Sequence, residues 1–98
     1  METVYSVNGV PIRLTYERWY HIIENHDDLA SHFYDVLETI EKPEFVIRGN
    51  EGTLKATKNF SKKNGWSLFI KEVSQKDGFV ITAYFLEKKA KGEIIWRR

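Results

Sequence analysis

The chain has 98 residues, of which 42% are hydrophobic and 14% aromatic, and its net charge is +1. This length and composition are typical of one globular domain, residues 1–98, with a single core. The absence of cysteine excludes a disulfide framework, a thiolate nucleophile and a cysteine-ligated zinc site. No apolar run approaches the ~20 residues of a membrane helix and no secretory signal is evident, so we expect a cytoplasmic protein without a membrane partner.

Charge is distributed unevenly along the chain. Residues 1–51 hold ten acidic and four basic side chains, a net charge of −6, whereas residues 52–98 hold four acidic and eleven basic ones, a net charge of +7. This asymmetry is compatible with a nucleic-acid or acidic-protein partner. It is also compatible with an acidic helical layer on a basic sheet that binds no ligand, so both interpretations stay open.

Two helices are expected in the first half of the chain. Thr15 is a suitable N-cap for the first, which we place over Tyr16–Glu24. Asn25 can cap a second helix over residues 26–41, where apolar residues recur at the spacing of one buried stripe. Pro43 ends this helix.

Short strands are expected on both sides of the helices. A small edge hairpin with an Asn8-Gly9 turn precedes them, over Val4–Val7 and Val10–Leu14. After residue 43 the apolar period changes to two, which predicts strands at Phe45–Arg48, Thr53–Phe60, Trp66–Val73, Phe79–Leu86 and Ile94–Arg97. Their short connections predict a meander of antiparallel neighbours. The expected fold is α+β: an N-terminal hairpin and two helices packed on a four- to five-stranded antiparallel meander sheet.

The stretch Trp66–Lys88 is the centre of the predicted sheet. Asp77-Gly78 is a strong hairpin signal. If Gln75–Gly78 form a four-residue turn, Lys71 lies opposite Thr82. If Asp77 and Gly78 alone form the turn, Lys71 lies opposite Tyr84. The two registers differ by two residues, so every side chain keeps its face and all three polar residues share one face in both.

The two faces of this sheet are predicted to differ in character. The core face of the central hairpin carries Trp66, Leu68, Ile70, Phe79, Ile81, Ala83 and Phe85. Pairing Phe60 with Trp66 adds Leu54, Ala56 and Phe60 to this face. Pairing Phe60 with Trp66 and Lys88 with Glu93 extends the opposite face, which then carries Lys55, Thr57, Asn59, Lys71, Thr82, Tyr84 and Arg97, with Val80 also on it and Arg97 beside Tyr84. This polar face is either a solvated surface or a binding floor for an anion.

Among the three histidines, His26 is the candidate for chemistry. It lies at the predicted start of the second helix, where backbone N–H groups attract anions, and histidine exchanges protons near neutral pH. We expect His21 to be a satisfied structural residue and His32 to be exposed. The histidines are five and six residues apart, which does not place two ligands on one helix face, so we expect no metal and no cofactor.

A histidine, cations and hydroxyl groups on a sheet suit the cleavage of RNA without a metal. A base removes the proton of the 2′-OH, cations stabilise the charge that develops on the phosphorus oxygens, and an acid protonates the departing oxygen. Phe69 and Tyr84 could stack on bases, as aromatic side chains do with single-stranded RNA.

Five segments carry a resemblance to a known family: Arg18–His26, Lys42–Val46 at the end of the second helix, Leu68–Lys71, Val80–Tyr84 and Ile94–Trp96. Together they resemble the phage-associated group of barnase, EndoU, colicin and RelE-like nucleases, over roughly residues 18–96. The resemblance implies two helices followed by a four-stranded antiparallel sheet, and metal-independent cleavage of RNA by a toxin.

Carried over position by position, the resemblance places the family's histidine on His26, its sheet lysine on Lys71 and its sheet hydroxyl on Thr82. The family usually has arginine and proline around that histidine, where this chain has asparagine and aspartate. A phosphate contact from the missing arginine would have to come from another residue, and Arg18 is available.

The leading hypothesis is therefore a small metal-independent endoribonuclease, a toxin of a toxin-antitoxin or phage-related system. Its catalytic residues would be His26, Lys71 and Thr82, and its substrate-binding residues Lys55, Tyr84, Arg97, Arg18 and Phe69. The partners would be RNA and an antitoxin protein, and the oligomeric state stays open. Two alternatives remain: a non-catalytic module that binds RNA or an antitoxin, and a degenerate nuclease domain retained for protein contacts.

Overall fold

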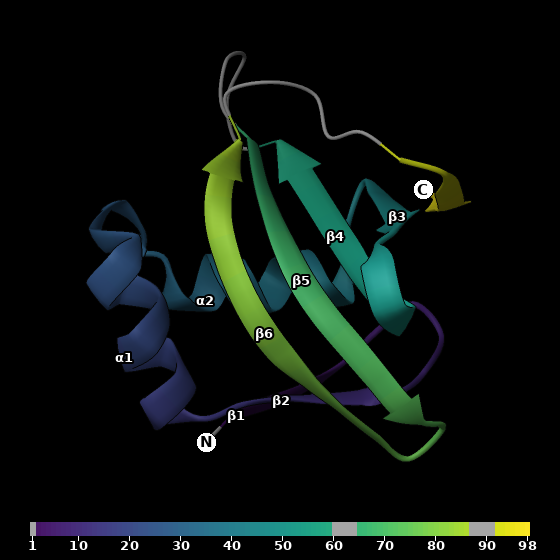
Figure 1. The fold of residues 1–98 in the computed structure, drawn as a ribbon, viewed down its shortest axis with the longest axis horizontal. Coiled ribbons are helices and arrows are strands. Elements are labelled where there is room, and N and C mark those ends of the chain that lie inside the picture. The colour runs from purple at the N-terminus through teal and green to yellow at the C-terminus, as the bar shows by residue number, and fades with distance from the viewer. Residues whose placement is uncertain (1, 60–64, 87–91) are drawn as a thin grey trace.

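The computed structural model describes residues 2–59, 65–86 and 92–98, apart from the side chains at positions 59, 65–67, 69 and 86. Within these ranges it contains two α-helices and one mixed sheet of seven strands (Figure 1). The strands are β1 (Glu2–Tyr5), β2 (Pro11–Leu14), β3 (Phe45–Arg48), β4 (Thr53–Asn59), β5 (Gly65–Ser74), β6 (Asp77–Leu86) and β7 (Ile94–Arg97). Their order in the sheet is β1-β2-β6-β5-β4-β3-β7. The expected four- to five-stranded antiparallel sheet is therefore too small, and β2 pairs with β6 in parallel.

The first helix, α1 (Tyr16–Asn25), begins where the sequence predicts it. The Thr15 side chain accepts a hydrogen bond from the backbone N–H of Arg18 at 3.1 Å, which satisfies one of the free donors of the first turn. Trp19 and Ile22 are buried on the inner side of the helix. The predicted N-cap of this helix is confirmed.

The second helix is shorter than expected: α2 spans Phe33–Glu41. Asn25 does not cap it, because its side chain donates to the backbone carbonyl of His21 at 3.1 Å and completes α1. A separate 3₁₀ turn, η1 (Asp27–Leu29), follows and places Leu29 in the core. The connection between the two helices is therefore an independent turn and not the first turns of α2.

Both helices pack on one side of the sheet. Figure 1 shows α2 passing behind β4, β5 and β6, and α1 lying beside the edge of β6. Buried apolar side chains from both helices, the N-terminal hairpin and the central strands form the core; they are Val10, Ile12, Leu14, Trp19, Ile22, Leu29, Val36, Leu37, Ile40, Leu68, Ile70, Val80 and Ala83. We call this side of the sheet the core face and the opposite side the outer face.

The predicted meander of β3, β4, β5 and β6 is confirmed, each strand lying antiparallel to the next. Lys58 pairs with Trp66, two residues away from the expected register. A shift of two residues preserves the face of every side chain. Leu54 and Ala56 therefore lie on the core face as predicted; Phe60 lies outside the described residues.

The β5–β6 turn lies at Gln75-Lys76 and not at Asp77-Gly78. Lys71 consequently pairs with Phe79, so neither of the two expected registers is correct. Gly78 is needed for a close approach of chains: a Cβ atom there would lie 2.8 Å from the backbone oxygen of Lys71 and 2.5 Å from Cδ1 of Ile12. Gly78, which the sequence suggests as part of a turn, instead lies in β6 and leaves room for β2 beside it.

An extra residue in β6 reverses the predicted faces near the turn. Phe69 pairs with Thr82 and the next residue, Ile70, pairs with Val80, so Ile81 forms a β-bulge. Ala83 remains on the core face, but before the bulge Val80 is buried there instead of Phe79. The prediction of core positions for Phe79 and Ile81 and an outer position for Val80 missed this inserted residue.

The N-terminal hairpin has a longer loop than expected, because β1 spans Glu2–Tyr5 instead of Val4–Val7, and the hairpin joins the main sheet. Gly9 adopts a φ of +75° in its loop, a conformation that glycine accepts readily. Ser6 donates to the Glu72 carboxylate at 2.6 Å and the Asn8 side chain donates to the same carboxylate at 3.1 Å. These bonds hold the hairpin loop against the end of β5.

The last strand, β7, lies at the opposite edge of the sheet from the predicted one. It pairs with β3, with Arg97 opposite Phe45, because β2 already occupies the edge of β6. Four strand spacings separate β7 from β6, about 19 Å. Arg97 is therefore not beside Tyr84.

The close approach at Gly78 predicts a measurable loss of stability on substitution. Gly78→Ala should lower the free energy of unfolding by about 1–3 kcal/mol, because the added methyl group meets backbone atoms of β5 that cannot yield without shifting the strand. Urea unfolding measures the change. Gln75→Ala, in the exposed turn, is the control and should change stability by less than about 0.5 kcal/mol; equal stability of the two variants would contradict the packing described.

Candidate functional site

The outer face of the central strands carries cations, hydroxyl groups and aromatic rings. By strand register and alternation it includes Arg13 on β2, Phe79, Thr82 and Tyr84 on β6, Lys71 on β5, and Thr53, Lys55 and Thr57 on β4. Neither α1 nor α2 covers this side of the sheet (Figure 1). The predicted grouping of Lys55, Lys71, Thr82 and Tyr84 on one face is thus present.

This face is closed towards β3. Thr57 is 4% exposed and donates a hydrogen bond to the backbone oxygen of Phe45 at 3.3 Å. Ile47 is 1% exposed, and a Cβ atom on Gly92 would lie 2.5 Å from its Cγ2. The part that a ligand can reach is therefore the part around β5 and β6, where Lys71, Thr82 and Tyr84 are half-buried.

His26 lies next to Tyr84 at the edge of β6. The centroids of the two rings are 5.9 Å apart and their planes are inclined by 35°. His26 is half-buried, and no hydrogen bond joins its ring nitrogens to another described residue. An imidazole beside the exposed part of the outer face can exchange a proton with a group bound there.

The backbone environment of His26 differs from the predicted one. Its N–H donates to the carbonyl of Ile22 at 2.8 Å, so the residue ends α1. The C-terminal end of a helix carries the negative end of the dipole and does not attract anions. Only the three-residue η1 turn starts after His26. The expectation of an anion-binding helix start at this position is wrong, and an anion would have to be held by the sheet.

Lys71 and Tyr84, the residue that His26 contacts, lie on the same face of the sheet but are far apart along the strands. Tyr84 pairs with Ser67, four residues before Lys71 in β5, which corresponds to about 13 Å. Thr82 lies between them: it pairs with Phe69, and its diagonal neighbour on β5 is Lys71, at about 7–8 Å. His26, Thr82 and Lys71 therefore do not meet at one point.

A second cation at this end of the face lies on β2. Phe79 pairs with Lys71 on one side and with Arg13 on the other. Arg13 also forms an ion pair with Asp77 at 2.9 Å, whereas Lys71 makes no ion pair with another described residue. A row of two cations separated by an aromatic ring crosses this end of the outer face.

The remaining predicted binding residues are scattered. Arg18 is exposed on α1 and lines a hollow with Phe79, near the Lys71 end of the face. Lys55 is half-buried and lies two strands from Thr82, about 10 Å away. The Phe69 side chain lies outside the described part of the structure. Arg97 lies near the far edge and does not contribute to this site.

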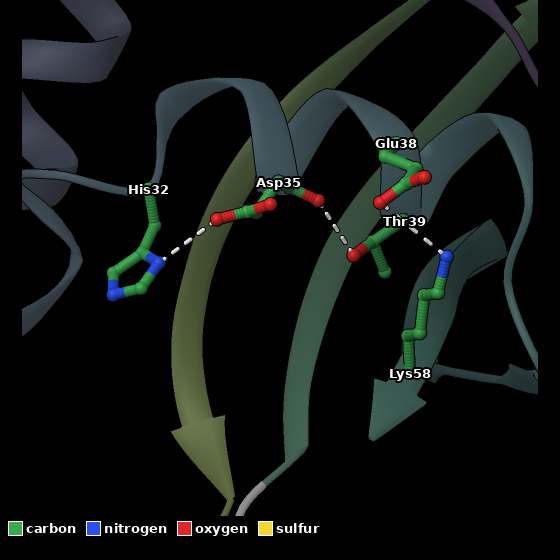
Figure 2. Close-up of polar contacts among 5 residues, drawn as sticks. All are labelled: His32, Asp35, Glu38, Thr39 and Lys58. Atoms are coloured by element: carbon green, nitrogen blue, oxygen red, sulfur yellow. Dashed lines mark hydrogen bonds and ion pairs between the residues drawn. The ribbon is translucent and has the colours of Figure 1, made fainter. Parts of the chain in front are cut away.

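A second polar cluster, which the sequence did not reveal, lies on the core face below α2 (Figure 2). Nδ1 of His32 lies 3.0 Å from the Asp35 carboxylate, and its ring packs edge-on against Phe85. Nζ of Lys58, with a side chain only 15% exposed, lies 3.5 Å from the Glu38 carboxylate. These contacts attach α2 to β4 and β6, so His32 is not the exposed residue that the sequence suggested.

His21 also differs from its prediction. It is exposed on α1 rather than buried as a structural histidine. Among residues 2–59, 65–86 and 92–98, no three histidine or carboxylate side chains come together as metal ligands. In the same ranges, no helix has the length and apolar character needed to cross a membrane.

Comparison with known proteins does not assign the chain. It matches no protein-family model, and neither the curated protein sequences nor the solved structures contain a match. The geometry of the outer face must therefore support any functional assignment.

The contact between His26 and Tyr84 can be tested directly. Removing the Tyr84 ring in Tyr84→Leu should shift the ring proton resonances of His26, because an aromatic ring whose centroid is 5.9 Å away contributes to their local magnetic field. Proton NMR of the imidazole signals measures this change. Tyr20→Leu, which removes an exposed ring from α1, should leave the His26 signals in place. If the His26 signals are also unchanged in Tyr84→Leu, the contact does not exist.

Proposed function

We propose that this protein is a small ribonuclease that holds single-stranded RNA on the outer face of its sheet and cleaves it by acid–base chemistry. The observation that supports it best is the imidazole of His26, 5.9 Å from the Tyr84 ring, at the edge of a helix-free face that carries Lys71 and Thr82. Such a face offers charge for phosphates and a ring for bases.

His26 is the proton-transfer group in this proposal. It takes the proton of a ribose 2′-OH or supplies one to the departing oxygen, steps that a positioned histidine accelerates by about 10²- to 10⁴-fold. Thr82 lies two residues from Tyr84 along β6, towards Lys71, and can donate its hydroxyl proton to a phosphate oxygen. Tyr84 positions the adjacent base by stacking.

Lys71 takes a different role from the one that the sequence suggested. Lys71 lies about 13 Å along β5 from Ser67, the residue paired with Tyr84. Its ammonium group would therefore contact a neighbouring phosphate of the RNA and not the one that is cleaved. It therefore contributes to affinity. A toxin that an antitoxin neutralises remains our expectation for the biological setting, and it rests on the family resemblance.

The test is cleavage of single-stranded RNA in EDTA. His26→Ala should lower kcat by about 100-fold or more, since it removes the proton-transfer group. His21→Ala is the matched control, because His21 is an exposed histidine on the same helix that lies outside the site, and it should retain wild-type kcat. Equal activity of the two variants, or no cleavage by the wild type, would rule out the proposed chemistry.

The second candidate function is an RNA-binding module without cleavage. The separation of Lys71 from His26 favours it, because cations spread along a face suit a bound strand more than a single reacting phosphate. Phosphate contacts release counterions, so binding should weaken as salt increases.

This second function makes its own quantitative prediction. Lys71→Gln should reduce the slope of log K against log salt by about 0.7 for single-stranded RNA, the value expected for one lost phosphate contact. Fluorescence anisotropy at several salt concentrations measures the slope. Lys76→Gln, in the exposed turn outside the face, should leave it unchanged; a slope that is the same for the wild type and Lys71→Gln would exclude a phosphate contact of Lys71.

A further inference from the structure

We infer that the corner between β2, the start of α1 and β6 is a phosphate-binding subsite. A hollow of about 170 Å³ lies there, lined by Arg13, Thr15, Arg18, Phe79 and Val80. Two arginines from different elements line one small space, and arginine has the planar array of donors that matches phosphate oxygens.

The bonding of Arg13 leaves part of its guanidinium available. Both contacts to the Asp77 carboxylate, at 2.9 and 3.2 Å, come from Nη2. Nε and Nη1 make no hydrogen bond with another described residue. Asp77 thus fixes one edge of the guanidinium group, and two donor nitrogens remain for a ligand.

The net charge around the hollow is positive although a carboxylate is present. Asp77 offsets one cation, but the Arg18 guanidinium has no partner among the described residues. Lys71 adds a further positive charge on the other side of Phe79. An anion in the hollow would therefore meet an excess of positive charge.

The other lining residues also suit a phosphate that belongs to a nucleotide. The Thr15 oxygen accepts the N–H of Arg18 at 3.1 Å, so its own hydroxyl proton can be donated to a ligand. Phe79 supplies an apolar wall beside the cations. An adjoining ribose or base could lie against this ring.

This assignment deepens the proposed function and rests on it for its biological role. Arg18 and His26 are eight residues apart on one helix, which corresponds to about 12 Å. A phosphate bound in the hollow is thus separate from a phosphate cleaved at His26. The hollow would hold the strand and would raise affinity without taking part in the chemical step.

The experiment is a ¹⁵N NMR titration of the whole chain. One arm uses inorganic phosphate and the other uses a single-stranded oligouridylate with 2′-O-methyl groups, which the proposed chemistry cannot cleave. The backbone amide signals of Thr15, Arg18 and Phe79 should shift. Shifts with phosphate alone would identify a site for the free anion, and shifts with the oligonucleotide only would identify a site for a strand phosphate; both support the subsite.

The affinity test uses whichever probe shifts these signals in the wild type. Arg18→Gln should raise the dissociation constant of that probe about tenfold, because a charge-assisted hydrogen bond is lost. Arg48→Gln is the control: Arg48 is an exposed arginine on β3 paired with Glu93, and its loss changes the net charge equally. Absence of shifts at the hollow, or equal affinity of the two variants, would overturn the subsite. The spectra also report whether each variant is folded, and the result does not depend on whether the wild type cleaves RNA.

Discussion

One inserted residue decides what the central strands present on each side of the sheet. Ile81 has no partner in β5, so the alternation of β6 is reversed between its two ends. On the turn side of the bulge Val80 enters the core and Phe79 moves to the outer face beside Lys71. Without the bulge, the aromatic ring between the cations of β2 and β5 would be buried under the helices. The cationic end of the outer face therefore depends on a local irregularity of the ladder.

The same irregularity explains which parts of the fold can be predicted from the sequence. The strand registers differ from the predicted ones at both β4–β5 and β5–β6, but the face assignment survives wherever the difference is an even number of residues. Leu54 and Lys55, for example, lie on the expected sides although their strand is shifted by two. An odd insertion has no compositional signature, because Ile81 has the strand propensity of its neighbours. The helix N-cap at Thr15 was predictable, since its hydrogen bond is local.

Non-local pairing accounts for most of the remaining differences, and these affect the candidate site most. The hairpin at the N-terminus takes the edge of β6 through only two parallel pairs, and this sends β7 to the other side of the sheet. Nothing near Arg97 in the sequence indicates that β2 has occupied the nearer edge. The shared face of Lys71 and Thr82 was predictable because it follows from parity within one hairpin. The contact of His26 with Tyr84 depends on how α1 lies against β6, which a single sequence does not specify.

The spacing of the functional groups limits the kind of ligand that the outer face can use in full. His26 lies at the Tyr84 end of β6, whereas Arg13 and Lys71 flank Phe79, four β5 residues away, or about 13 Å. A single phosphate or a mononucleotide at one end would leave the charged groups at the other end exposed to water and unused. A chain of linked phosphates with stacking bases can contact both ends at once, and each additional contact is then made at the high effective concentration that the linkage provides. The extended arrangement, more than any one residue, makes a single-stranded polymer the ligand that this surface fits.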